Sequence, residues 1–204
     1  MPTFKRSKRT YRRRPRRAVR KYRKSFPKYL RPEVKRIDST YATGITSTEA
    51  TILLNGLTQG LEYNQRIGRK ITSKSIAIRG YVQNADANVN QVRLLLVYDK
   101  QTNQALPTMS DIIDGNLFNG FRNLDNIKRF KILSDRRMAL QVTADSGVRY
   151  FKMYKKIRLD TIYDDTTNNI NAITSGSIIL FLISTDATTG VTSNIDWRFT
   201  YTDV

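Results

Sequence analysis

Apolar and polar residues alternate with a period of two along most of the chain after residue 36. The alternation is cleanest near the C-terminus, where Ile195, Trp197, Phe199 and Tyr201 are separated by single polar residues. This period places the apolar side chains on one face of a β-strand. The pattern predicts eight strands, at residues 48–54, 75–83, 91–98, 129–133, 138–143, 150–159, 177–184 and 195–202.

The predicted strands are joined by polar segments rich in Asn, Asp, Gly and Thr. Residues 91–98 are apolar on both faces, which indicates a central strand. The longest gap, 100–128, contains a segment at 107–113 that predicts one short helical turn. Eight strands without a βαβ rhythm predict an all-β fold, an eight-stranded antiparallel jelly-roll sandwich. An immunoglobulin-like sandwich is the alternative.

Charge divides the chain into two parts. Residues 1–36 contain 17 Lys or Arg and a single acid, Glu33, whereas the other 168 residues contain 19 bases and 16 acids. Mutual repulsion and Pro2, Pro15, Pro27 and Pro32 oppose a compact fold in the first part. We therefore expect a disordered basic N-terminal arm at 1–36 and a jelly-roll domain at 37–204.

The basic arm predicts binding to nucleic acid. Lys and Arg that neutralise phosphates release condensed counterions, and interleaved tyrosines can stack on unpaired bases. The predicted nucleic-acid-binding residues of the arm are Lys5, Arg6, Lys8, Arg9, Tyr11, Arg12, Arg13, Arg14, Arg16, Arg17, Arg20, Lys21, Tyr22, Arg23 and Lys24. The same residues can serve as a nuclear-localisation signal. A membrane-surface tail is disfavoured because the few apolar residues show no helical period.

A second candidate surface lies on the predicted strand at 150–159. Lys152, Lys156 and Arg158 share one face with Tyr150 and Tyr154, so bases and aromatic rings alternate there as well. An ordinary solvated strand face is the competing interpretation. Lys155 departs from the pattern, because alternation places it among the apolar residues. A strand end, a bulge or an outward-reaching side chain would explain it.

Catalytic and metal chemistry find little support in the sequence. The chain has no Cys and no His, which excludes disulfides, thiol nucleophiles and His-based dyads. Asn84, Asp86 and Asn88 have the first spacings of a calcium loop but lack its Gly and its final Glu. Asp164 and Asp165 form a carboxylate pair in a polar loop. We expect no catalytic residues, no metal site and no cofactor.

Membrane and secretion signals are also missing from the sequence. The longest purely apolar run, 178–183, is too short to cross a bilayer, so no membrane insertion is expected. The N-terminus lacks the apolar stretch of a secretory signal, which favours a cytosolic or nuclear protein.

Several segments together resemble the capsid proteins of circular, Rep-encoding single-stranded DNA viruses, which are circovirus-like and share a jelly roll with satellite viruses. The segments are the arginine cluster at 11–17, residues 97–100, Pro107-Thr108, Ile112-Ile113, residues 129–135 and the closing 197–203. The resemblance spans nearly the whole chain, although no single motif is diagnostic.

The resemblance implies a T=1 icosahedral shell of sixty copies, built from the jelly-roll domain, that packages single-stranded DNA on its arms. Sixty arms would carry on the order of 1000 positive charges, the scale of the phosphates in a strand of one to two kilobases. The resemblance further implies a location in the virion and, during assembly, in the host nucleus, with import receptors and a cell receptor as partners. RNA remains open as the packaged strand. A non-viral nucleic-acid-binding protein and a jelly-roll lectin or enzyme are the competing function classes.

Overall fold

Strand formation follows the alternation of apolar and polar side chains. The computed structural model describes residues 32–85, 88–141, 147–188 and 190–203. Within these ranges the strands are β1 (Val34–Tyr41), β2 (Gly44–Ile45), β3 (Ala50–Leu53), β4 (Lys70–Asn84), β5 (Asn90–Asp99), β6 (Phe130–Leu140), β7 (Val148–Tyr163), β8 (Ile173–Ser175), β9 (Ser177–Ser184) and β10 (Val191–Asp203). Single 3-10 turns lie at Met109–Asp111 and Ile170–Ala172, and the first confirms the helical turn predicted in the long gap.

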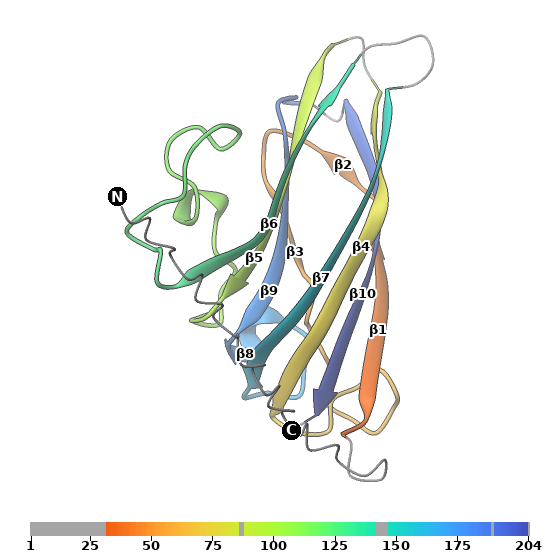
Figure 1. Cartoon of the computed structure of the whole chain (residues 1–204), viewed down its shortest axis with the longest axis vertical. Helices are drawn as coiled ribbons and strands as arrows, with labels where there is room; N and C mark the ends of the chain where they lie inside the picture. The colour runs from red at the N-terminus through yellow and green to blue at the C-terminus, as the bar shows by residue number, and fades with distance from the viewer. Residues whose placement is uncertain (1–31, 86–87, 142–146, 189, 204) are drawn as a thin grey trace, which may run out of the picture. The chain divides into compact units, whose positions relative to one another are not determined.

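The strands form two sheets (Figure 1). Sheet 1 has the order β1-β10-β4-β7-β8, with β2 also paired to β10, and sheet 2 has the order β3-β9-β5-β6. All pairings between these strands are antiparallel. The chain crosses repeatedly from one sheet to the other, as at β4 to β5 and at β6 to β7. Four principal strands in each sheet confirm the jelly-roll prediction, in preference to the immunoglobulin-like order.

The main core fills the space between the sheets. Ile76, Ile78 and Val82 of β4 and Ile195 and Phe199 of β10 point inward and are buried. The inner faces of β5 and β9 pack against them through Val92, Leu94, Leu96, Ile178, Leu180 and Leu182. Burying each such side chain contributes roughly 1.5–3 kcal/mol. The alternation predicted for β4 and β10 is therefore confirmed, and it determines which face of sheet 1 stays outside.

A second core covers the outer face of sheet 2. Leu95 and Val97 of β5 and Ile179, Phe181 and Ile183 of β9 point away from the first core. The long β5–β6 loop, residues 100–129, packs over them with Met109, Ile112 and Ile113. β5 and β9 are buried on both faces for this reason, and β5 lies between β9 and β6. The prediction that 91–98 is a central strand is confirmed.

Two arginines hold this loop against the sheet. Arg93 on β5 pairs with both carboxylate oxygens of Asp135 on β6, at 3.0 and 2.7 Å. It also donates hydrogen bonds to the carbonyl oxygens of Leu117 and Phe118 in the loop. Arg129, at the end of the loop, pairs with both oxygens of buried Asp99, at 3.0 and 2.8 Å. Loop placement thus depends on charged hydrogen bonds as well as on apolar contacts.

Two strand predictions are wrong. The segments predicted at 129–133 and 138–143 fall on one strand, β6 (Phe130–Leu140), which continues through Ser134 to Arg137. The polar residues 134–137 in the middle of β6 interrupt the apolar alternation, so the sequence predicted two strands. They are tolerated because β6 is an edge strand and because Asp135 pairs with Arg93. β1 was missed, and it begins at Val34, within the segment expected to be arm.

Lys35 explains why β1 escaped detection. Its side chain points inward, where a strand pattern requires an apolar residue, yet only 2% of the residue is exposed. The ammonium group pairs with Asp203 at 3.1 Å and donates to the carbonyl oxygen of Gln65 at 2.9 Å. A lysine counted with the arm therefore belongs to the folded domain.

Within the described ranges, no helix has the length and apolar character needed to span a membrane.

Candidate nucleic-acid interface

The outer face of sheet 1, here called the open face, carries the second surface predicted from sequence. Tyr150, Lys152, Tyr154, Lys156 and Arg158 are all exposed on this side of β7, the tyrosines by 79% and 61%. Their neighbours Phe151, Met153 and Ile157 are buried in the core. The structure therefore brings the five predicted residues together on one face of one strand.

β4 adds two residues that sequence reasoning did not single out. Arg79 lies opposite Lys152 in the β4–β7 register, and Tyr81 lies opposite Tyr150. The two tyrosine rings are 5.9 Å apart and tilted by 57°. Alternation places Arg79 and Tyr81 on the polar face of their strand, but no local signal shows that β4 and β7 are neighbours. Cations and aromatic rings on the open face therefore come from two neighbouring strands, β4 and β7.

The acids of the open face mostly have partners. Asp38 pairs with Arg198 at 2.7 and 2.6 Å, and the hydrogen bond from Arg198 lowers the pKa of Asp38. Asp160 pairs with Lys70 at 2.9 Å, and this contact lowers the pKa of Asp160. Asp196 accepts a hydrogen bond from Thr40 at 2.7 Å. Asp38 and Asp160 are therefore already neutralised by cationic partners, whereas Asp196 keeps its charge, because its partner is a neutral hydroxyl group.

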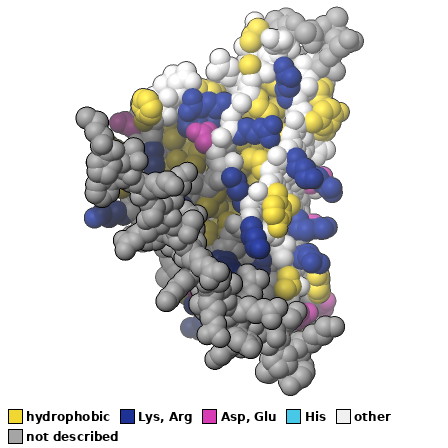
Figure 2. Space-filling view, in the orientation of Figure 1, with side chains coloured by type: hydrophobic (Ala, Val, Ile, Leu, Met, Phe, Trp, Pro, Cys, Tyr) yellow, Lys and Arg dark blue, Asp and Glu magenta, His cyan; other side chains and the backbone are white. Residues whose placement is uncertain are grey.

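Several cations of the same face are unpaired. In the part of the chain that the structure describes, the side chains of Arg79, Lys152, Lys156 and Arg158 make no ion pair and no hydrogen bond. Asp196 lies opposite Arg79 in the register but makes no ion pair with it. Figure 2 shows Lys and Arg side chains gathered along β7 and the edge of the sandwich beside it. The open face therefore has an excess of positive charge available to a ligand.

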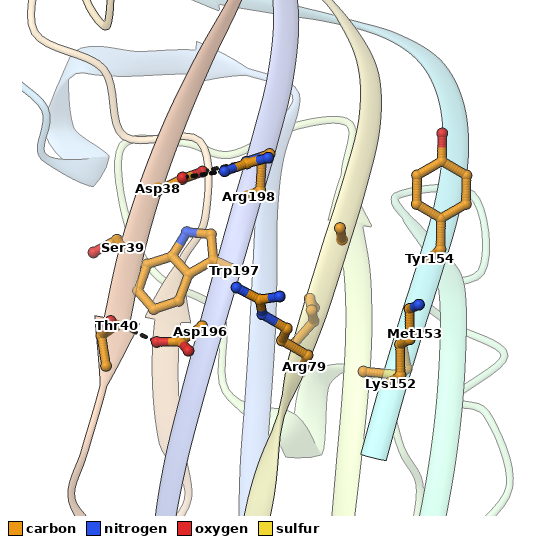
Figure 3. A pocket seen from close by; sticks show the side chains of 12 residues that line it. Asp38, Ser39, Thr40, Arg79, Lys152, Met153, Tyr154, Asp196, Trp197 and Arg198 are labelled. Carbon is orange, nitrogen blue, oxygen red and sulfur yellow. Dashed lines mark hydrogen bonds and ion pairs between the residues drawn. The ribbon is translucent and has the colours of Figure 1, made fainter. Parts of the chain in front are cut away.

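A groove of about 750 Å³ crosses this face (Figure 3). Its floor is at Ala77, which lies between Arg198 and Tyr154 in the strand register. The small side chain leaves a depression between two large ones. Figure 3 shows Arg79 between Asp196 on one side and Lys152 on the other. A groove with cations and an exposed ring along its sides suits a chain of phosphates and bases.

Lys155 keeps its inward phase on β7 and is half-buried. It pairs in register with Ile76, and the register shift between β4 and β7 begins only beyond Lys156. It lies at neither a strand end nor a bulge, so an outward-reaching side chain is the explanation that fits its place in the pattern.

The arm residues predicted to bind nucleic acid, Lys5 to Lys24, lie outside the described residues, and their role stays a prediction. Among the residues that are described, no three Asp or Glu side chains form a group able to hold a metal ion. The structure adds no candidate cofactor site to the sequence prediction.

The comparisons with known proteins point to viral coats. A family model described as satellite tobacco necrosis virus coat protein matches residues 5–204. No curated protein sequence matches the chain. Among solved structures, Desmodium yellow mottle tymovirus matches with 11% identity and a TM-score of 0.41, covering 88% of this chain and 92% of that one.

A second structural match is the infectious bursal disease virus VP2 subviral particle, with 13% identity and a TM-score of 0.26. It covers 85% of this chain, which spans only 33% of that protein. Neither TM-score reaches 0.5, so neither likeness supports a functional conclusion.

The family match covers nearly the whole chain and decides between the classes that the sequence left open. The protein is a viral coat protein and a component of the virion, not a non-viral nucleic-acid-binding factor. The narrower resemblance to circular DNA viruses is not supported, because the matching model is that of a satellite virus. The chain belongs to the satellite tobacco necrosis virus coat protein family.

Proposed function

We propose that this coat protein assembles into a T=1 shell of sixty copies and packages single-stranded nucleic acid through its basic arm and the open face. The observation that carries the proposal is the array of unpaired cations and exposed tyrosines on β7 and β4. Solvated strand faces commonly mix both signs of charge, whereas here two of the three acids, Asp38 and Asp160, are already paired with cations.

The open face offers two kinds of contact. Tyr150, Tyr154 and Tyr81 present rings on which unpaired bases can stack, each worth roughly 1–3 kcal/mol in related sites. Arg79, Lys152 and Lys156 supply charge for the phosphates. Both contacts tolerate any sequence, since every base has a π-face and phosphates carry no base information. A coat protein that encloses a whole genome needs this tolerance.

The open face is proposed to look into the shell, on the side of the genome. The arm is covalently continuous with β1, an edge strand of sheet 1. Sheet 2 has its outer face covered by the β5–β6 loop.

Shell contacts are proposed to come from loops and strand edges. Leu61 in the β3–β4 loop is 91% exposed, and Phe121 in the β5–β6 loop is 88% exposed. Leu124 and Tyr63 in the same two loops are exposed as well. Large apolar side chains grouped on a surface commonly mark contacts between proteins. Repeating a few such contacts with closed symmetry produces a container from one gene product.

The identity of the packaged strand is tested directly, because the sequence resemblance implies DNA whereas the match to a satellite-virus coat protein favours RNA. Electron microscopy of the purified protein tests the shell. Digestion of the extracted nucleic acid with DNase or RNase then identifies the strand. Closed shells that protect nucleic acid are expected. Protein that stays monomeric at every salt concentration contradicts the proposal.

Import of the coat protein into the host nucleus is proposed as a further role of the arm. A fluorescent reporter fused to residues 1–31 is expected to accumulate in nuclei, because the arm holds nearly all of the basic clusters. A reporter spread evenly through the cell would argue against this role.

A further inference from the structure

A second cationic groove lies where the two sheets meet at the edge of the sandwich. It has a volume of about 320 Å³ and lies between β6 and β7. β6 is the edge strand of sheet 2, and β8 pairs with β7 only at Ile162 and Tyr163. Over most of their length, the facing edges of β6 and β7 are therefore open. The residues that line the groove are Lys131, Ile132, Leu133, Lys155, Lys156, Ile157, Arg158 and Leu159.

Two lysines reach this groove from inner faces of the sandwich. Lys155 lies opposite Ile76 in the register, and Ile76 belongs to the core between the sheets. Lys131 lies opposite Tyr98, which packs against the same core. Partners in register point to the same side of a sheet. Each lysine sits on an edge strand, so its aliphatic stem can lie along the core while its ammonium group comes out between the edges.

Charge in the groove is of one sign. Its lining contains four cations and no carboxylate. The nearby acids have partners elsewhere, since Asp135 pairs with Arg93 and Asp160 pairs with Lys70. Leu133, Ile157 and Leu159 form low-dielectric walls because they pack on or within the core. A cleft with apolar walls and charge of one sign focuses its field and concentrates counter-ions.

We propose that the β6–β7 groove binds the phosphate backbone of the packaged single strand through Lys131 and Lys155. The inference rests on the proposed function and extends it to residues outside the tyrosine-bearing face. Lys156 and Arg158 line the groove and also stand on the open face. They make the two surfaces one continuous path, so a strand stacked on Tyr154 continues around the edge of the sandwich into the groove.

The mixed walls of the groove favour nucleic acid over an acidic segment of a second copy. A sugar or base can lie against Leu133 and Ile157 while its phosphate meets the lysines. The charge of the domain also favours nucleic acid, because the 168 residues after residue 36 carry 19 bases against 16 acids. The test must therefore distinguish binding of nucleic acid in the groove from a contact with another copy of the chain.

The test measures the binding of full-length protein, purified free of nucleic acid, to fluorescent oligothymidylate and oligouridylate at several salt concentrations. The variant Lys131→Gln with Lys155→Gln removes two groove charges. Its plot of log affinity against log salt is expected to flatten by about 1.4, because each phosphate contact with a single strand contributes about 0.7 to the slope. Lys131→Arg with Lys155→Arg keeps the charges and should keep the wild-type slope.

The matched control is Arg69→Gln with Lys128→Gln, which removes the same charge from two exposed loop residues outside the groove. Its slope should equal that of the wild type. An unchanged slope in the Lys131 and Lys155 glutamine variant overturns the proposal. Equal flattening in the control also overturns it, because the effect would then reflect net charge alone. Loss of shells with an unchanged slope would assign the groove to a contact between copies.

A second measurement does not depend on any variant folding. Ultraviolet crosslinking of nucleic acid in wild-type shells, followed by mass spectrometry, is expected to give adducts on peptides that contain Lys131 or residues 155–159. Adducts on Tyr150 or Tyr154 without any in the groove would overturn the groove alone and leave the proposed function intact. Failure of the wild-type protein to bind either oligonucleotide would overturn both.

Discussion

The two sheets of the sandwich have similar inner faces and opposite outer faces. Sheet 2 buries its outer face beneath the β5–β6 loop, with Phe181 and Met109 fully enclosed. Sheet 1 leaves its outer face open and fills it with cations and tyrosines. Apolar area stabilises the first face, whereas the second contributes little to stability and is available for a ligand. One sheet of the sandwich therefore supplies stability through both of its faces, whereas the other leaves one face free for the proposed binding.

Removing a buried ring from the covered face should have the largest effect on the free energy of unfolding. Phe181→Ala removes a fully buried ring from the second core. Loss of transfer free energy together with a residual cavity should lower the free energy of unfolding by about 3–5 kcal/mol. Urea unfolding of unassembled protein measures the change. Tyr150→Ala on the open face is the matched control and should cost about 0.5 kcal/mol or less. Similar losses in both would show that the faces do not differ in this way.

One ion pair on each outer face provides a second test of the difference between the faces. Arg93→Ala on the covered face leaves two loop carbonyl groups without their donor and Asp135 with only its longer ion pair to Arg137, at 3.7 Å. We expect a loss of about 3 kcal/mol. The control Arg198→Ala removes the pair with Asp38 on the open face, where both side chains are more than half exposed. Exposed pairs contribute about 0–1 kcal/mol. Denaturant midpoints of the two variants should differ clearly, and equal midpoints would contradict the assignment.

The boundary of the arm gives a third, smaller effect on stability. Deleting residues 1–31 should leave unfolding unchanged and remove most nucleic-acid binding. Deleting residues 1–36 also removes Lys35, the partner of Asp203, together with the β1 residues that pair with Thr202, Tyr201 and Thr200, and should cost on the order of 2 kcal/mol. Thermal unfolding of the two deletions makes the comparison. Equal stability would show that the start of β1, with its buried ion pair, contributes nothing, and collapse of the shorter deletion would show that the arm is part of the fold.

The smallest effect on stability should accompany a functional loss. Lys152→Gln, Lys156→Gln and Arg158→Gln together keep polar chains on the open face and should change unfolding by about 0.5 kcal/mol or less. Shells should still assemble but contain less nucleic acid, seen as a lower ratio of nucleic-acid to protein absorbance. Unchanged packaging would mean that the open face is an ordinary solvated surface, whatever the arm does.

Sequence reasoning succeeded where local alternation controls the structure. The range 177–184 of β9 was predicted correctly, and Ile195, Phe199 and Tyr201 of β10 are buried as expected. The grouping of Tyr150 with Lys152 on β7 was also correct. Each of these depends on one strand and the period of its own side chains.

The misses share a different cause, which is dependence on distant residues. Lys35 is buried only because Asp203 lies beside it, although the two are far apart in the sequence. Asp135 interrupts the apolar pattern of β6 because Arg93 needs a partner. Arg79 joins Lys152 through a strand order that no local pattern encodes. The groove lysines likewise become neighbours only when two sheets close on each other.

The position of Lys35 has a mechanical consequence for a coat protein whose arm is proposed to bind the genome. β1 and β10 pair over eight residues, and the first rung joins Val34 to Thr202. Tension on the arm enters the domain at this rung, where peeling of the strand would begin. The Lys35–Asp203 pair lies beside it, at 3.1 Å and largely shielded from solvent on the lysine side. The ion pair is therefore expected to resist tension on the arm, because β1 can separate from β10 beyond Val34 only after the Lys35–Asp203 contact breaks.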